Sequence, residues 1–236
     1  MAQAGFKTKK MVSLILILSL ACLLFQFGPT VNGAVANAGA AQDPPTIGWT
    51  QVPFSYYIQK PWDLDLSERY HYDAATDTHT MWVYNTDKPF KQGNTTDPRT
   101  EMRWYNEYSS GEHMWEADVY IEEGSVGSSV MQILRINRPA GTPATDIMLV
   151  VHPDNTVRRY FSDPNGALIK SNVYNNWWNL KVAHNADEGI IRVYADDELV
   201  LTVEDRGPAT RHFKNGVYGV EGRSETKFRN LKYWVK

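Results

Sequence analysis

The sequence predicts an all-β fold, a sandwich of two antiparallel sheets. From residue 80 onward, short runs of alternating apolar and polar residues are separated by Gly, Asn, Asp and Pro. These runs are rich in Trp, Tyr, Val and Ile, which favour strands. Alternation with a period of two places the apolar residues of a strand on one face, so each sheet is expected to bury one face and expose the other.

The expected elements follow one another along the chain. Residues 115–121 are the clearest strand, because every second residue is apolar. Residues 189–205 predict a hairpin that turns at Asp196 and Asp197. The other expected strands cover residues 98–105, 129–136, 145–152, 156–161, 177–185, 212–220 and 227–235. Only residues 63–72, near the start of the domain, permit a helical turn.

The first 33 residues have the order of a secretory signal peptide. Three lysines precede an uncharged, mainly apolar run over residues 11–27, and small residues follow it. We expect cleavage after Gly33, with Ala36 or Ala38 as alternatives, then a flexible leader over residues 34–45 and a single domain over residues 46–236. A retained membrane anchor is the alternative, and it is disfavoured because 17 apolar residues are at the short limit for a bilayer span.

Composition narrows the class of protein. Cleavage would remove three lysines and no acidic residue, so the net charge would change from −3 to −3 − 3 = −6. An acidic chain argues against a nucleic-acid partner. Cys22 is the only cysteine and lies in the signal peptide, and no metal-ligand cluster is apparent. We therefore expect a monomer without metal or cofactor and, after signal removal, without membrane attachment.

The signal peptide predicts that the protein is secreted or sent to the vacuole. Asn94 begins a glycosylation triplet.

The stretch PRTEMRWY, residues 98–105, carries the first candidate site residues. Arg99, Glu101 and Arg103 occupy alternate positions, so a strand would place them in a row on one face. Burying two arginines and a glutamate inside a sandwich would carry a heavy desolvation cost, so we expect this row on a solvated, concave face. A plain solvated face with a Glu–Arg pair is the simpler interpretation.

Two later runs add polar residues in the same alternation. Gln132 lies in one of them, and Lys214 and Tyr218 lie in the other. Together with the arginines they would suit a ligand that carries a carboxylate, because the guanidinium fork matches the two carboxylate oxygens. Gly216, between Lys214 and Tyr218, is typical of a bulge or of a close backbone approach.

These motifs, in this order, resemble known families. RTEMR, MQI and HFKNGVY look like the three motifs of the family 7 polysaccharide lyases, which are alginate lyases with a concanavalin-like β-jelly-roll fold. A closer resemblance, over nearly the whole mature chain, is to the plant citrate-binding proteins of the same superfamily. It is carried by WVYNTDKP, PRTEMR, SSG, NVYNNWWNLKVAHN and DRGPATRHFKNGVY. Glucuronan lyases share this jelly roll.

The resemblance implies roles for individual residues. Arg99 and Gln132 would neutralise the substrate carboxylate, and Tyr218 would be the catalytic phenol of a β-elimination. The substrate-binding groove would also contain Glu101, Arg103 and Lys214.

Two positions depart from the lyase pattern. Leu134 stands where the lyases have histidine, and His212 replaces the first tyrosine of the third motif. Tyr218 could serve as both base and acid if nearby cations lower its pKa. Histidine occurs at positions 71, 79, 113, 152, 184 and 212. Only His212 is on the right strand, and it lies six residues from Tyr218, or about 20 Å along a strand.

Two functions therefore remain open. The first, slightly favoured, is a polyuronate lyase of the alginate or glucuronan type. The second is a non-catalytic protein that binds citrate or an acidic polysaccharide. Trp104, Tyr105, Tyr108, Trp177 and Trp178 could stack on sugar rings, although packing in the core is the more common use of such residues.

Overall fold

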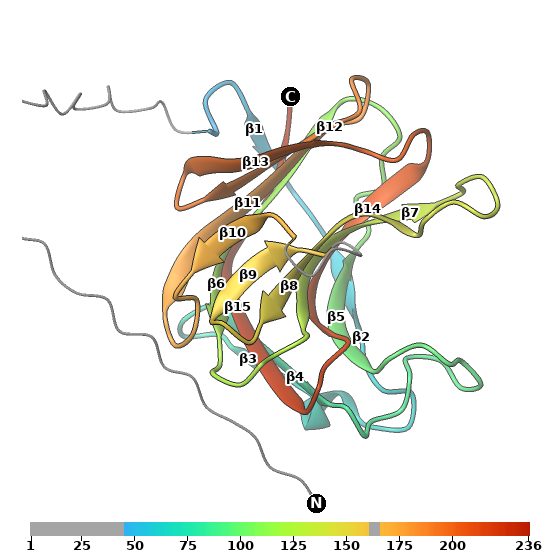
Figure 1. The fold of residues 1–236 in the computed structure, drawn as a ribbon, viewed down its shortest axis with the longest axis vertical. Coiled ribbons are helices and arrows are strands. Elements are labelled where there is room, and N and C mark those ends of the chain that lie inside the picture. Colours follow the sequence, from blue (N-terminus) through green and yellow to red (C-terminus); the bar gives the residue numbers. More distant parts are fainter. Residues whose placement is uncertain (1–44, 161–165) are drawn as a thin grey trace, which may run out of the picture. The chain divides into compact units, whose positions relative to one another are not determined.

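The computed structural model describes residues 45–160 and 166–236, which form two sheets of antiparallel strands (Figure 1). This confirms the predicted fold class. The expected signal peptide and almost all of the expected leader lie outside the described residues, so the cleavage site and the domain boundary remain predictions. The part of the chain that is described contains no helix long and apolar enough to span a membrane.

Sheet A is the larger sheet. Its strands are β1 (Thr50–Val52), β3 (Tyr70–Asp73), β4 (Thr78–Tyr84), β6 (Glu112–Ile121), β11 (Trp177–Asn185), β12 (Ile190–Ala195), β13 (Glu198–Glu204) and β15 (Arg223–Val235). Within the described residues, they follow the order β13-β12-β11-β6-β15-β4-β3, and β1 pairs with β15.

Sheet B carries the predicted site residues. Its strands are β2 (Tyr56–Gln59), β5 (Arg99–Trp104), β7 (Ser129–Ile136), β8 (Thr145–His152), β9 (Thr156–Arg159), β10 (Leu168–Ser171) and β14 (Thr210–Tyr218). Their order is β10-β9-β8-β7-β14-β5-β2, so β14 lies between β7 and β5 (Figure 1). Segments far apart in the sequence thus become neighbours.

The apolar side chains of both sheets form one hydrophobic core. Sheet A contributes alternate residues of β6, and sheet B contributes alternate residues of β5, β7 and β14. The completely buried members of this set are Trp115, Ala117, Val119, Ile121, Met102, Trp104, Met131, Ile133, Phe213 and Val217. The residues between them in sequence point to the outer faces of the sheets.

Several predicted details are confirmed. The hairpin between β12 and β13 turns at Asp196 and Asp197, and both residues have positive φ (50° and 68°), as a two-residue turn of this kind requires. The expected helical turn is a short 3-10 helix, η1 (Leu66–Glu68). Five strands were not predicted: β4, of seven residues, and β1, β2, β3 and β10, of only three or four residues each. Alternation over so few residues gives little periodic signal.

Candidate functional site

All six predicted catalytic and substrate-binding residues lie on strands of sheet B. Arg103 pairs with Lys214 across β5 and β14, and Lys214 pairs with Gln132 across β14 and β7. Arg99 pairs with Tyr218 further along β14. Since the alternate residues of these strands fill the core, the six side chains belong to the outer face of the sheet. The prediction that they share one face is confirmed.

Gly216 explains how β14 and β5 approach so closely at this site. Its φ is +150°, and a Cβ atom there would lie 2.3 Å from the backbone oxygen of Thr100 and 2.6 Å from Cα of Glu101. Any side chain would force the two strands apart. The close backbone approach predicted from the sequence is confirmed.

Glu101 is the centre of a compact polar group that we call the Glu101 cluster, formed by Arg99, Glu101, Arg103, Gln132 and Lys214. The Glu101 carboxylate accepts a hydrogen bond of 2.5 Å from Gln132 Nε2 and a second one from Lys214 Nζ. Arg99 NH1 lies 3.5 Å from Glu101 Oε2, the same oxygen that accepts from Lys214. Glu101 and Lys214 are each only 1% exposed.

This burial corrects the expectation of a solvated charged row. The charges satisfy one another across three strands, which offsets part of the desolvation cost that made burial look prohibitive. Burial still lowers the pKa of Lys214, with Arg99 and Arg103 acting in the same direction and Glu101 opposing them. Arg103 donates a 2.8 Å hydrogen bond to the backbone oxygen of Trp104 and forms an ion pair with Glu107.

Arg99 and Tyr218 are in direct contact. The Arg99 guanidinium lies over the Tyr218 ring, 4.1 Å from its centroid, a cation–π arrangement. Arg99 Nε is buried and forms no hydrogen bond with the described residues. Arg99 therefore keeps its Nε donor for a further partner.

The pKa of Tyr218 differs in direction from the expectation. Burial raises it above its usual value, and Asp97 and Glu101 act in the same direction, whereas Arg99 lowers it. Arg99 lowers the pKa of Tyr218 as expected, but the effect of burial is larger. Tyr218 is therefore a neutral phenol at physiological pH, ready to donate a proton and poorly suited to accept one.

A pocket of about 420 Å³ adjoins this face. Tyr218 forms part of its lining, together with Met148 and Val150 of β8. Met148 pairs with Gln132 across β7 and β8, so the pocket borders the Glu101 cluster. Its volume lies within the range of small-ligand sites.

Leu134 and His212 are direct cross-strand neighbours on β7 and β14. His212 is 2% exposed, and neither ring nitrogen has a hydrogen-bond partner among the described residues. Burial, followed by Arg103 and Lys214, lowers the pKa of His212 to about 3. The imidazole is therefore neutral at physiological pH, and it lies toward the opposite end of β14 from Tyr218.

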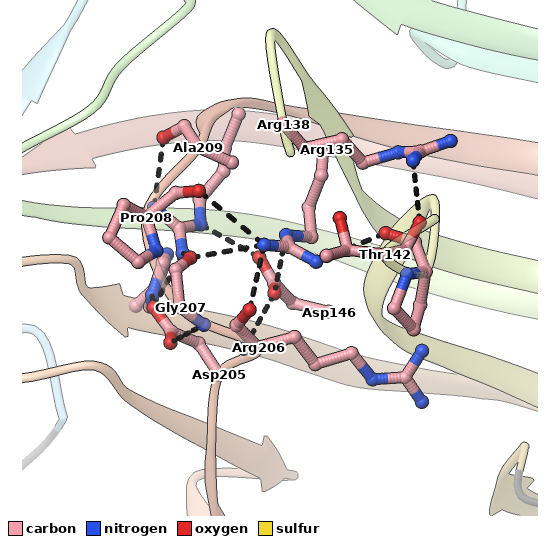
Figure 2. Close-up of polar contacts among 12 residues, drawn as sticks. Arg135, Arg138, Thr142, Asp146, Asp205, Arg206, Gly207, Pro208 and Ala209 are labelled. Atoms are coloured by element: carbon pink, nitrogen blue, oxygen red, sulfur yellow. Dashed lines mark hydrogen bonds and ion pairs between the residues drawn. The ribbon is translucent and has the colours of Figure 1, made fainter. Parts of the chain in front are cut away.

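A second polar group was not predicted as a site. We call it the Asp146 network, formed by Arg135, Asp146, His184, Asp205 and Arg211. Arg211 Nε donates to Asp146 Oδ2 at 2.7 Å, and its NH2 donates to Asp205 Oδ2 at 2.6 Å. Figure 2 shows Asp146 and Arg135 beside the loop from Asp205 to Ala209.

The remaining members of this network also contact one another, although Arg135 Nε forms no hydrogen bond with the described residues. Arg135 Nε lies 3.2 Å from Asp146 Oδ1, and its NH2 donates to the backbone oxygen of Arg206 at 2.7 Å. His184, on sheet A, lies 3.1 Å from Asp205 and 3.0 Å from the Tyr108 hydroxyl. The network thus ties β11 of sheet A to the strands of sheet B. Its sequence signal was the phrase DRGPATR, used above only for its resemblance.

The other candidate residues divide between core and surface. Trp104, Tyr108 and Trp178 are buried, as packing predicts, whereas Tyr105 is 55% exposed. Trp177 lies on sheet A, with the Arg229 guanidinium 4.2 Å from its ring centroid. Asn94 is exposed in the loop between β4 and β5, where a glycan could be accommodated. The described residues contain no group of three or more His, Cys, Asp or Glu side chains that could hold a metal ion.

Comparison with known proteins identifies the family. A family model described as alginate lyase (Alginate_lyase2) matches residues 54–234. The chain is 36% identical over 198 residues to a citrate-binding protein of Hevea brasiliensis, covering 80% of this chain and 79% of that protein.

Solved structures of alginate lyases share the fold. The alginate lyase AlgAT5, of polysaccharide lyase family 7, superposes with a TM-score of 0.61 at 19% identity, covering 75% of this chain and 93% of that chain. AlyA1 from Zobellia galactanivorans gives 0.59 at 12% identity, covering 80% and 95%. With the fold shared and the family model matching residues 54–234, the chain belongs to the alginate lyase family, Alginate_lyase2.

Proposed function

We propose that the protein recognises a carboxylate-bearing ligand, an acidic polysaccharide or citrate, on the outer face of sheet B. One observation carries the proposal: Arg99 is stacked on Tyr218, which lines a pocket, and its buried Nε has no hydrogen-bond partner among the described residues. A buried, unpaired donor on a guanidinium is costly unless a ligand supplies the acceptor. A carboxylate supplies two acceptors in the geometry that arginine matches.

Binding without catalysis is the function that this geometry supports best. A β-elimination needs a base for the proton next to the carboxylate, and burial raises the pKa of Tyr218. Leu134 has no titratable group, and its neighbour His212 lies six residues along β14 from Tyr218. Loss of a positioned base typically lowers a rate by about 10²–10⁴. The citrate-binding relative from Hevea is in line with this proposal.

A polyuronate lyase is the second candidate, favoured by the contact between Arg99 and Tyr218 beside the pocket. In that reaction the base would take the proton α to the carboxylate, and a carbon–carbon double bond would form as the bond to the 4-oxygen breaks. The expelled oxygen would receive a proton from Tyr218. Arg99 and Gln132 would stabilise the negative charge that develops on the carboxylate.

One experiment separates the two candidates. The purified protein is titrated calorimetrically with citrate and with a panel of polyuronates, and the same mixtures are followed by the ultraviolet absorbance of unsaturated uronate. Binding without product is the result that we expect. Accumulation of unsaturated product would make the protein a lyase, and absence of binding to every ligand in the panel would refute carboxylate recognition.

The cellular location belongs to the same proposal. The signal-like first 33 residues and the exposed Asn94 triplet support passage through the secretory route, to the cell exterior or the vacuole. Intact-mass analysis of the mature protein tests it. A chain that begins near Ala34 and lacks Cys22 is expected, and a mature chain that retains Cys22 would contradict it.

A further inference from the structure

The pocket beside Tyr218 has a charge opposite to that of the residues that would hold a carboxylate. Two of its lining residues, Asp97 and Glu221, are acidic, and none of the described residues that line it is Lys, Arg or His. Its apolar wall is formed by Met148 and Val150. Arg99 is in contact with the Tyr218 ring and is not among the described residues that line the pocket. The charge along the outer face therefore changes from positive to negative at Tyr218.

The two carboxylates are available to a ligand. Asp97 and Glu221 are exposed, and neither side chain forms a hydrogen bond or an ion pair with the described part of the chain. Their charges are therefore not neutralised locally. Any second carboxylate that entered the pocket would meet two like charges, and a neutral hydroxyl group would meet two strong acceptors.

The backbone of Gly127 helps to place Glu221 at the pocket. Gly127 has a φ of +80°, and a Cβ atom there would lie 3.2 Å from Cγ of Glu221. A side chain at this position would press against Glu221 and against the backbone oxygen of Gly219, 3.3 Å from the Cβ position. The absence of a side chain at Gly127 therefore leaves room for Glu221 beside the pocket.

We propose that this pocket binds an uncharged, hydroxyl-bearing sugar next to the uronate held by Arg99, so that chains with alternating uronate and neutral sugars bind more tightly than pure polyuronates. The inference rests on the proposed function, because it presumes that Arg99 binds a uronate. The acidic lining acts as a repulsive element against a neighbouring carboxylate, a common way to achieve specificity. The hydroxyl groups of the neutral sugar donate hydrogen bonds to Asp97 and Glu221.

The test compares two tetrasaccharides by calorimetry at low ionic strength, one of uronates only and one in which uronate alternates with a neutral hexose. The unmodified protein is compared with the double variant Asp97→Asn/Glu221→Gln. The charge-matched control is Asp63→Asn/Glu198→Gln, because both control residues are exposed and without a side-chain partner in the described structure.

The unmodified protein should bind the alternating chain more tightly. The pocket variant should bind the all-uronate chain about three- to tenfold more tightly than the unmodified protein, as expected when two partly screened repulsions are removed. This gain should shrink at high ionic strength. The control variant should keep the preference of the unmodified protein.

The outcomes separate this inference from the proposed function. Two results would overturn the inference and leave carboxylate recognition intact. In the first, the protein binds both chains but prefers the all-uronate chain. In the second, the pocket variant has the same ratio of affinities for the two chains as the unmodified protein. Failure to bind either chain overturns the proposed function, and the inference with it.

Discussion

The Glu101 cluster and the Asp146 network both bury charges on sheet B, but they differ in how completely those charges are paired. In the Asp146 network, Arg211 and Arg135 have carboxylate and carbonyl partners on nearly every side. In and beside the Glu101 cluster, Arg99 Nε and both nitrogens of His212 have no hydrogen-bond partner among the described residues. Arg135 Nε of the Asp146 network also forms no hydrogen bond, but it lies 3.2 Å from the Asp146 carboxylate.

The difference indicates what each group is for. A buried network whose charges face one another on several strands holds elements of the fold together. A partly paired group on an outer face, next to a pocket, carries a desolvation cost that a ligand can relieve. We therefore assign the Asp146 network to the fold and the Glu101 cluster to recognition.

The largest expected effect is on stability, through Asp146. Asp146→Asn should lower the free energy of unfolding by about 3–5 kcal/mol, because Arg135 and Arg211 would lose their shared counter-charge in a buried site. Urea denaturation measures this. Lys170→Met, which breaks the more exposed pair with Asp196, is the control and should cost at most about 1 kcal/mol. Equal losses in the two variants would remove the distinction on which the comparison rests.

The next effect is a pH dependence that comes from His212. The folded protein keeps this imidazole neutral down to about pH 3, whereas an unfolded chain protonates it below about 6.5. The unfolded state therefore binds more protons in this window, and stability must fall as the pH falls through it. Between pH 7 and 5, the unmodified protein should lose about 2 kcal/mol more than a His212→Leu variant. Parallel stability curves for the two proteins would show that His212 does not titrate in this way.

The smallest expected effect on binding concerns Tyr218. Tyr218→Phe keeps the ring on which Arg99 stacks, so ligand affinity should change by less than about threefold, or roughly 0.6 kcal/mol. Calorimetry measures the affinity. If the protein proves to be a lyase, the Tyr218→Phe variant should form no unsaturated product. A Leu134→His variant should then form product faster than the unmodified protein. A large loss of affinity in Tyr218→Phe would mean that the hydroxyl, rather than the ring, contacts the ligand.

Much of the fold could be predicted from the sequence because long strands have a clear period. The expected strands at residues 129–136, 145–152 and 177–185 have the bounds of β7, β8 and β11. The shared face of Arg99, Gln132 and Tyr218 followed from the same alternation. β1, β2, β3 and β10 escaped prediction because three or four residues give little periodic signal, and β4, of seven residues, was also missed although its residues alternate in burial.

The parts of the site that could not be predicted depend on register between strands. Nothing in the sequence places Gln132 and Lys214 on the same carboxylate, so the burial of Glu101 was not foreseen. The same holds for His212, whose position beside Leu134 is set by the pairing of β7 with β14. The direction of the Tyr218 pKa also required the structure, because the effect of burial exceeds that of the nearby Arg99.

The central claim is that Arg99 in the Glu101 cluster is the ligand-binding cation, and calorimetric titration of an acidic oligosaccharide tests it most directly. Arg99→Ala should weaken binding by about ten- to a hundredfold, as expected for the loss of a charge-assisted, bidentate contact. Arg99→Lys should recover only part of this, because lysine has the charge without the planar fork. Unfolding temperatures of both variants should stay close to that of the unmodified protein. An Arg99→Ala variant that folds normally and binds with unchanged affinity would contradict the account.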